Sequence, residues 1–438
     1  MESVPAPAPG APAIPGAPPA LQPLPRQQRI GAVDVLRGFA LLGAVVVNTQ
    51  AFAGHLPPPP GTLADRVAAW LVAWLLTAKS YSLFSLLFGL GFAIQMERAE
   101  ARGQDFGPFF RRRCLILFLI GVANAVLLFE GDILTLYAIL GLVLLLFRRS
   151  TPATLVRWAV GLLSLAVAIN LLGALAFTSV PQTAGGAGGT GRAVAEGVEQ
   201  AAREVVYRTG SYFDVVRVRL GPALNQAIGQ LVLGFPNVFA MFLLGLALGR
   251  VRAFAAIEEH LALFRALCRW GLLLGLPLNA LSATLTTQLG AGAEGPAFWL
   301  GEAVQAAGAP LLMLGYLGSI VLLLRRGGAG EVWGNRPPGR GEVAGAVLGR
   351  LAPMGQLSLT CYLGSSLLLN LAYYGFGLGL YGRTGAAGDL LVGLAVYALL
   401  LVCSTLYVPL FRYGPAEWLW RSLTYGRRQP WLRGALAG

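Results

Sequence analysis

The stretch that decides the fold is RIGAVDVLRGFALLGAVVVN, residues 29–48. It places a carboxylate, Asp34, a guanidinium, Arg37, and an amide, Asn48, in a segment that is otherwise apolar enough for lipid. At about 100° per residue, Asp34 and Arg37 lie one helical turn apart, and Asn48 returns to within about 20° of Arg37. Because a charge at the bilayer centre costs roughly 3 kcal/mol or more, such a face should point away from lipid. We therefore expect this helix to form the inner wall of a helical bundle.

The whole chain has the composition of a membrane protein. Of its 438 residues, 56% are hydrophobic and 12% are charged, against about 25% charged residues in an ordinary soluble domain. Its mean hydropathy is +0.65. We predict an all-α fold, a polytopic transmembrane helical bundle of about ten spans with interfacial amphipathic helices. The spans are expected at residues 32–52, 80–97, 113–129, 132–147, 153–177, 231–250, 263–285, 297–324, 350–374 and 387–411.

The basic residues indicate how the spans are oriented. With the N-terminus in the cytosol, the cytosolic segments hold 24 Lys or Arg residues and the outer segments hold eight. Under the positive-inside rule this asymmetry predicts cytosolic N- and C-termini in a multi-pass protein of the cell (inner) membrane. It also accounts for the net charge of +13 without nucleic acid, so the expected partner is the lipid bilayer.

Composition divides the chain into six segments. Residues 1–28 are rich in Pro and Ala and are typical of a disordered cytosolic tail. They precede an N-terminal transmembrane region at residues 29–178 and an extracytoplasmic loop and helix at residues 179–222. The remaining segments are the central spans at residues 223–324, a cytosolic linker at residues 325–349, and the C-terminal spans with a surface helix at residues 350–438.

Two amphipathic helices are predicted to lie at the membrane interface. One runs from Leu63 to Thr77, where Trp70 and Trp74 are one turn apart. The other, PAEWLWRSLTY near the C-terminus, carries Glu417 and Arg421 four residues apart, a spacing that favours an ion pair. Aromatic side chains of this kind are typical of the headgroup level.

The charged residues near the cytosolic ends of the spans have two interpretations. Asp34 and Arg37 can form a structural ion pair, or Arg37 can bind a phosphate or carboxylate while Asp34 fixes its orientation. The cytosolic run of Arg111, Arg112 and Arg113 would attract the same anion.

Polar residues toward the outer side include the candidate catalytic groups. Asp132 follows Glu130 in the turn FEGD, where it can act as a general base or simply cap the next helix. Asn124 in the third span should point inward, and His55 in the outer loop is a second candidate base or an ordinary loop histidine. Lys79, the only lysine of the chain, can contact a ligand or anchor the second span at the interface.

Motifs for most cofactor-dependent chemistry are absent from the sequence. It contains no HExxH, P-loop, serine elbow or CxxC. The four cysteines fall within apolar runs and are expected to act as small core residues. We therefore expect no metal site and no tightly bound cofactor.

Several motifs in one order resemble a known family. They are RIGAVDVLRGFALLGAVVVN, KSYSLFSLLFGLGFAI, the RRR run leading to GDILTLYAILGLVLLLFRR, and GPAEWLWRSLTY. Together they resemble the YeiB-like bacterial membrane proteins, which have a C-terminal domain of unknown function (DUF418). The N-terminal half of these proteins is similar to the catalytic region of heparan-alpha-glucosaminide N-acetyltransferase. The similarity extends over nearly the whole chain from Arg29 onward.

The resemblance implies acyl transfer across the membrane. In the wider group of transmembrane acyltransferases, an acyl group passes from cytosolic acyl-CoA, here a co-substrate, to an acceptor on the far side. The acceptor would be a small molecule or a glycan. Arg37 and the run Arg111 to Arg113 would attract the phosphates of acyl-CoA, with His55 or Asp132 as the base. Asn48 and Asn124 would donate hydrogen bonds to the developing oxyanion.

The chain departs from its relatives at four polar positions. Asn124 stands where relatives usually have a histidine, and an amide cannot act as a base at neutral pH. Gln356, Cys361 and Ser365 replace the Arg, Asn and Gln of a later family motif. Acyl transfer can therefore be altered or lost in this chain. A transporter or permeation protein for a small anionic solute and a non-catalytic membrane scaffold remain as alternatives, and the oligomeric state is not indicated.

Overall fold

The computed structural model describes residues 30–54, 61–179, 187–289, 295–326 and 343–432. Within these residues the fold is helical, and the only β-type pairing is an isolated bridge between Phe411 and Leu432. The predicted all-α bundle is confirmed. The N-terminal tail, most of the cytosolic linker and His55 lie outside the described residues.

The chain forms sixteen α-helices in the described ranges. They are α1 (Gly31–Phe52), α2 (Leu63–Leu75), α3 (Lys79–Glu100), α4 (Phe106–Leu127), α5 (Leu134–Leu144), α6 (Pro152–Ser179), α7 (Ala187–Thr209), α8 (Tyr212–Gly229), α9 (Phe235–Arg250), α10 (Leu261–Thr284), α11 (Pro296–Arg326), α12 (Val343–Gly349), α13 (Ala352–Gln356), α14 (Ser358–Tyr373), α15 (Ala386–Tyr407) and α16 (Pro415–Tyr425). Short turns extend three of them, namely the 3₁₀ turn η2 (Leu145–Phe147) and the π turns η3 (Gln230–Gly234) and η4 (Leu285–Leu289).

Seven segments of the described chain are long and apolar enough to cross a membrane. These are Gly31–Phe52, Leu63–Glu100, Pro152–Ala176, Tyr212–Arg250, Leu261–Gln288, Pro296–Arg326 and Ala386–Tyr407. The chain is therefore a multi-pass membrane protein, but the predicted count of ten spans is not confirmed. The predicted spans at residues 113–129, 132–147 and 350–374 have no counterpart among the seven.

Each of these three segments falls short for a local reason. Helix α4 carries three consecutive arginines, Arg111 to Arg113, in its first half. Residues 134–147, which form α5 and η2, extend about 21 Å at 1.5 Å per residue, whereas the hydrocarbon core is ~30 Å thick. The third segment is divided between α13 and α14 by a break at Leu357, which leaves α14 with 16 residues.

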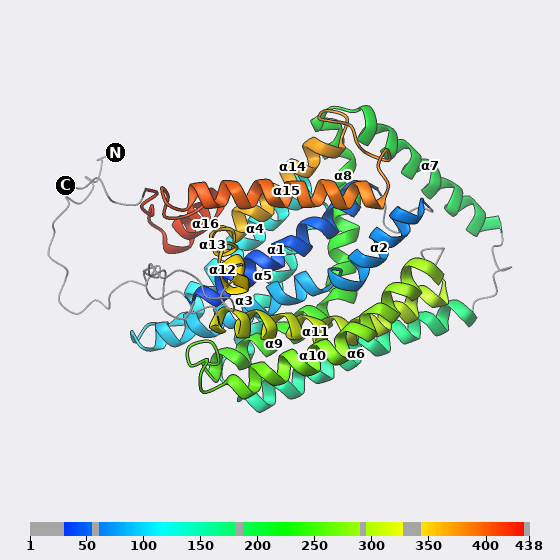
Figure 1. Ribbon diagram of the computed structural model, residues 1–438. Coiled ribbons are helices and arrows are strands. Elements are labelled where there is room, and N and C mark those ends of the chain that lie inside the picture. The colour runs from blue at the N-terminus through cyan, green and yellow to red at the C-terminus, as the bar shows by residue number, and fades with distance from the viewer. Residues whose placement is uncertain (1–29, 55–60, 180–186, 290–294, 327–342, 433–438) are drawn as a thin grey trace, which may run out of the picture.

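The beginning of α1 and the end of α15 lie at the same end of the molecule (Figure 1). Seven crossings alone would leave these two points at opposite ends. The shorter helices must therefore also reverse the direction of the chain, and the α4–α5 hairpin does so within the bundle (Figure 1).

Helix α1 lies inside the bundle and packs against α3, α13, α14 and α15. Its contact with α13 depends on two glycines, because a Cβ atom on Gly38 would overlap the Leu351 carbonyl and one on Gly355 would overlap the Asp34 carbonyl. Tyr397 of α15 donates a hydrogen bond of 3.0 Å to the Gly38 carbonyl from the other side. The inner-wall position predicted for this helix is confirmed.

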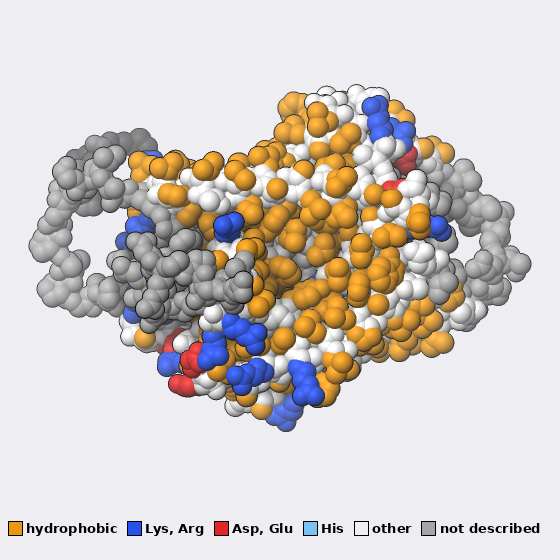
Figure 2. Space-filling view, viewed as in Figure 1, with side chains coloured by type: hydrophobic (Ala, Val, Ile, Leu, Met, Phe, Trp, Pro, Cys, Tyr) orange, Lys and Arg blue, Asp and Glu red, His pale blue; other side chains and the backbone are white. Residues whose placement is uncertain are grey.

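Hydrophobic side chains cover the middle of the face seen in Figure 2, and charged side chains gather toward its two ends. The exposed residues include large aliphatic side chains on helices of the bundle exterior, such as Leu172, Leu273 and Leu406. An apolar band between charged ends is the surface expected of a protein surrounded by lipid.

The two helices predicted at the interface make more contact with protein than expected. Helix α2 packs against α10 and α15. The indole nitrogens of Trp70 and Trp74 donate hydrogen bonds to Thr284 Oγ1, at 3.1 Å, and to the Leu276 carbonyl, at 2.9 Å. Helix α16 packs against α4 and α14, so both helices use their aromatic residues to join the bundle.

Candidate functional site

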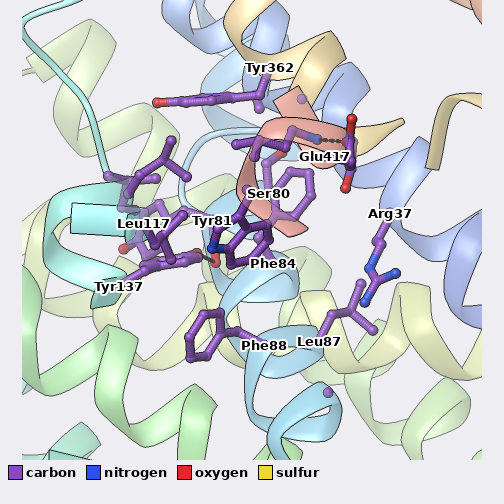
Figure 3. A pocket seen from close by; sticks show the side chains of 18 of the residues that line it. Arg37, Ser80, Tyr81, Phe84, Leu87, Phe88, Leu117, Tyr137, Tyr362 and Glu417 are labelled. Atoms are coloured by element: carbon purple, nitrogen blue, oxygen red, sulfur yellow. Dashed lines mark hydrogen bonds between the residues drawn. The ribbon is translucent and has the colours of Figure 1, made fainter. Parts of the chain in front are cut away.

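A cavity of about 350 Å³ lies between α1, α3, α4, α5, α14 and α16 (Figure 3). It follows one face of α1 from Arg37 through Ala44 to Asn48. These two polar residues are eleven positions apart, about 16 Å at 1.5 Å per residue along a helix. Helical periodicity therefore predicted correctly that Arg37 and Asn48 share one face, and that face borders an internal space.

Three arginines line one end of the cavity, which we call the arginine end: Arg37 of α1, Arg113 of α4 and Arg421 of α16. Arg113 is close enough to Arg37 and Arg421 for electrostatic repulsion. Its guanidinium lies over the indole ring of Trp420, with 3.7 Å between the guanidinium carbon and the ring centroid. Trp420 also donates a hydrogen bond of 3.1 Å to the Arg113 carbonyl, which joins α16 to α4.

Two carboxylates accompany these arginines. Asp34 is buried, and its Oδ1 lies 3.4 Å from Arg37 Nη1, so the predicted pair of α1 residues forms. Glu417 lines the cavity near Arg421 but does not pair with it as the sequence suggested. Three arginines and two carboxylates leave one positive charge in excess, which favours an anionic group at this end.

Glu417 instead caps the N-terminus of α14. Its Oε1 accepts hydrogen bonds from the backbone amides of Leu359, at 2.7 Å, and Thr360, at 3.1 Å, and its Oε2 accepts one from the Thr360 hydroxyl. The residue before α14, Leu357, has no side chain able to cap these amides. A carboxylate at a helix N-terminus satisfies free donors and interacts favourably with the helix dipole. The C-terminal helix therefore completes the start of α14.

Apolar and aromatic side chains line the middle of the cavity. Phe84, Leu87 and Phe88 come from α3, and Leu117 and Leu134 come from α4 and α5. The Tyr137 hydroxyl is used within the protein, because it donates a hydrogen bond of 2.8 Å to the Tyr81 carbonyl, as drawn in Figure 3. A largely apolar middle between polar ends suits a ligand with a chain between two polar groups better than a compact polar one.

Asn48 and Gly131 line the opposite end, which we call the asparagine end. The end of α1 meets the turn after α4 here, because Phe52 of α1 stacks on Phe129 with 4.7 Å between ring centroids. Gly131 belongs to the turn between α4 and α5, which also contains Asp132. The turn thus brings the polar FEGD motif next to the cavity.

Asp132 is buried beside this end and accepts three hydrogen bonds of known length. They come from Asn124 Nδ2 at 2.8 Å, from the Thr135 amide at 3.0 Å and from the Thr135 hydroxyl at 3.1 Å. Tyr362 of α14, which lines the cavity, lies close enough to Asp132 for the two side chains to interact. Asp132 therefore caps the start of α5, as one interpretation of the sequence held, and supports a phenol at the cavity wall. Asn124 and Asp132 reach the cavity only through such neighbours.

The other predicted site residues lie elsewhere. Arg111 and Arg112 are exposed and do not line the cavity. Lys79 is buried, and its Nζ donates a hydrogen bond of 2.8 Å to the Ala73 carbonyl while interacting electrostatically with Glu302. Its neighbours Ala78 and Ser80 line the cavity, so Lys79 points away from it. Within the described ranges, no three His, Cys, Asp or Glu side chains are grouped closely enough to hold a metal ion.

Sequence reasoning missed the residues that α14 and α16 contribute. Tyr362, Glu417, Trp420 and Arg421 all line the cavity. The charged and aromatic composition of α16 distinguishes it from the apolar spans, but this composition is typical of a helix at the membrane surface and does not indicate a cavity wall. Nothing in the local pattern indicates that this helix packs against residues some 300 positions earlier in the chain.

The match to a known protein family covers the C-terminal part of the chain. Residues 248–427 match the family model described as "Protein of unknown function (DUF418)". This region includes Tyr362, Glu417 and Arg421, whereas Arg37, Asn48 and Arg113 lie outside it. The matched region therefore contributes to a cavity whose other wall is N-terminal.

Similarity to curated proteins extends over almost the full length. The chain is 33% identical to the uncharacterized protein YxaH of Bacillus subtilis. The alignment covers 94% of this chain and 98% of the relative. It is 26% identical to an uncharacterized 39.9 kDa protein encoded in the amylase 3' region of Bacillus acidopullulyticus, with 94% and 98% coverage. It is also 26% identical to the uncharacterized protein YeiB of Escherichia coli, with 91% and 96% coverage. The chain thus belongs to the YeiB-like family of membrane proteins with a DUF418 domain.

Proposed function

We propose that this protein is an integral-membrane acyltransferase, which passes an acyl group from cytosolic acyl-CoA through the cavity to an acceptor on the far side. One observation carries the proposal: a single cavity joins a cluster of three arginines to the Asn48–Asp132 region across an apolar middle. Acyl-CoA has the same order of groups, with phosphates in the coenzyme A portion and a reactive thioester carbonyl at the far end of the pantetheine arm.

The proposed orientation puts the arginine end in the cytosol. The positive-inside rule supports it, because the segments on that side, including the exposed Arg111 and Arg112, hold most of the basic residues. Both termini would then be cytosolic in the bacterial inner membrane. Exposed arginines near the entrance would raise the local concentration of an anionic donor, and this effect weakens with salt.

Arg37, Arg113 and Arg421 would hold the phosphates of the donor. Guanidinium groups form bidentate, charge-assisted hydrogen bonds with phosphate oxygens. Asp34 would orient Arg37, and stacking on Trp420 would fix Arg113. Among the described residues no carboxylate forms an ion pair with Arg113 or Arg421, which leaves both guanidinium groups available to a ligand.

The chemical step would take place near the asparagine end. The acceptor hydroxyl or amine would form a bond to the thioester carbonyl carbon, and the carbon–sulfur bond would break. The acceptor proton would pass to the Tyr362–Asp132 pair and from there to the leaving thiolate. Asn48 would donate a hydrogen bond to the carbonyl oxygen as negative charge develops. A small molecule or glycan entering from outside would serve as the acceptor, and His55 remains a second candidate base.

Purified protein tests this proposal when incubated with radiolabelled acyl-CoA and assayed for hydrolysis or transfer. We expect turnover by the wild type and at least about a tenfold loss in Arg37→Ala, the equivalent of 1.4 kcal/mol. Arg157→Ala is the matched control, because Arg157 is an exposed arginine of α6 outside the cavity. Equal background rates in wild type and Arg37→Ala would reject acyl transfer.

Transport of a small anion is the second candidate, and one observation favours it. Gln230 lines the cavity and begins the π turn η3, an irregular stretch inside a membrane helix. Irregular backbone at membrane depth is typical of cavities that conduct solutes. Anion flux into liposomes without any acyl donor would support transport, and its loss in Arg37→Ala would link the flux to this cavity.

A further inference from the structure

The size of the cavity limits which part of an acyl donor it can enclose. Its volume of about 350 Å³ is near the lower end of the ~300–1,000 Å³ range for sites that bury drug-sized ligands. Coenzyme A combines a nucleotide, itself the size of such a ligand, with a thin pantetheine arm that ends in the thiol. The cavity has room for the arm but not for the arm and the nucleotide together.

The length of the cavity also matches the arm. Arg37 and Asn48 on α1, and likewise Arg113 and Asn124 on α4, are eleven residues apart, about 16 Å along each helix. A phosphopantetheine arm has about thirteen bonds between phosphorus and sulfur. An extended chain advances ~3.5 Å for every three bonds, as in one residue of extended polypeptide, so the arm is about 15 Å long. A phosphate at the arginine end would therefore put the thioester beside Tyr362 and Asn48.

The lining suits the chemistry of the arm. Its dimethyl and methylene groups would pack against Phe84, Leu87 and Phe88 in the apolar middle. The side chains of Gln95 and Gln356 also line the cavity, so amide groups border it as well as apolar side chains. Gln95 Nε2 donates a hydrogen bond of 2.8 Å to the Gly91 carbonyl, and its Oε1 would accept one from an amide of the arm. A uniformly apolar corridor would leave the amides of the arm without hydrogen bonds.

Protein contacts already occupy aromatic surfaces near the arginines. Arg113 covers the ring of Trp420. Phe110, one turn before Arg113, is 1% exposed and packs against Phe88 and Phe92, with centroids 6.2 Å and 4.8 Å away. Arg113 thus takes a position over Trp420 in which a nucleobase would stack, and Phe110 is enclosed by other rings.

We propose that the cavity recognises the phosphopantetheine arm of the donor, with its phosphate on Arg37, Arg113 and Arg421, and that the nucleotide contributes little. This inference rests on the proposed function for the identity of the donor. It narrows the substrate class to phosphopantetheine thioesters, whether the arm is carried by coenzyme A or by another phosphate-linked carrier.

Binding to the full-length protein in detergent tests the inference without any acyl group. Four probes are titrated calorimetrically: coenzyme A, 4′-phosphopantetheine, pantetheine without the phosphate, and adenosine 3′,5′-bisphosphate without the arm. We expect the first two to bind with Kd values within about threefold of each other. The other two should bind at least about tenfold more weakly, a difference of 1.4 kcal/mol.

Two variants assign the binding to this cavity. Arg421→Ala should weaken phosphopantetheine binding at least about tenfold and should leave binding of pantetheine unchanged, because pantetheine has no phosphate. Arg157→Ala should bind all probes as the wild type does. The inference is overturned if phosphopantetheine binds no better than pantetheine, or if Arg421→Ala has no effect.

The same titrations separate this inference from the proposed function. If coenzyme A binds only through its nucleotide half, the arm-recognition inference fails while acyl transfer stands. If phosphopantetheine binds as expected but no thioester is turned over, acyl transfer fails while arm recognition stands. If none of the probes binds, both are rejected.

Discussion

Glu417 and Leu359 are joined by a hydrogen bond of 2.7 Å, in which the carboxylate of one helix accepts the backbone amide at the start of another. The bond joins α16 to α14 across 58 residues of chain and leaves Glu417 buried at the arginine end of the cavity. One side chain therefore serves both as a helix cap and as part of the cavity wall.

Replacing this cap should destabilise the protein. Glu417→Ala leaves the Leu359 and Thr360 amides without an acceptor, and lost hydrogen bonds to a charged group cost about 1.5–3 kcal/mol. We expect a lower Tm in a detergent-solubilised melting experiment. Glu259→Ala, which removes an exposed glutamate, should melt like the wild type. An unchanged Tm in Glu417→Ala would contradict the capping role.

The buried Arg219 should be among the most sensitive residues of the bundle. It is fully buried, and it donates hydrogen bonds of 2.8 Å to the Leu127 carbonyl and to Asn370 Oδ1. Arg219→Ala removes both donors at once, and breaking a buried charged contact costs about 3–5 kcal/mol. Loss of folded protein, measured by size-exclusion chromatography and melting, is the expected result. Arg217→Ala is the control because this arginine is exposed on the same helix, and equal behaviour of the two variants would refute the prediction.

The glycine contact between α1 and α13 makes a prediction about packing. Gly38→Ala forces a methyl group into the Leu351 carbonyl, and such overpacking typically costs about 1–3 kcal/mol. Gly161→Ala on α6 is the matched change, since nothing lies within 4 Å of its added Cβ. That variant should be as stable as the wild type or more stable by about 0.5–1 kcal/mol, because alanine favours the helix. Melting temperatures in one detergent decide between the two outcomes.

The proposed proton route predicts a shared loss of activity in two variants. Tyr362→Phe removes only the hydroxyl that faces Asp132, and Asp132→Asn removes only the charge. Each should lower kcat by roughly 100-fold with little change in KM, because general acid–base groups contribute about 10²–10⁴-fold. The double variant should be no slower than either single variant. Additive losses would show that the two groups do not act together.

Helical periodicity explains why the polar face of α1 could be predicted. The angles that bring Asp34 next to Arg37 and align Arg37 with Asn48 are fixed by the helix itself. The same periodicity turns Lys79 away from the cavity, because one residue corresponds to about 100° on the helix. The sequence reveals the charge of Lys79 but not the direction in which α3 presents it.

The sequence predicted more spans than the seven segments that are long and apolar enough to cross a membrane, and that count stays a prediction. Helices α4, α5 and α14 are apolar enough to resemble spans, yet they are short or charged and lie against other helices around the cavity. Hydropathy measures how well a segment tolerates an apolar environment and does not distinguish lipid from protein. For this reason the sequence indicated the bundle but not which helices enclose the site.

The contribution of α16 to the cavity also sets a constraint on biosynthesis. Glu417, Trp420 and Arg421 leave the ribosome long after Arg37, yet they line the same end of the cavity. A nascent chain can insert its membrane helices in order but has no complete ligand site until translation passes residue 421. Premature termination before α16 should therefore produce a protein that inserts into the membrane but does not bind the ligand.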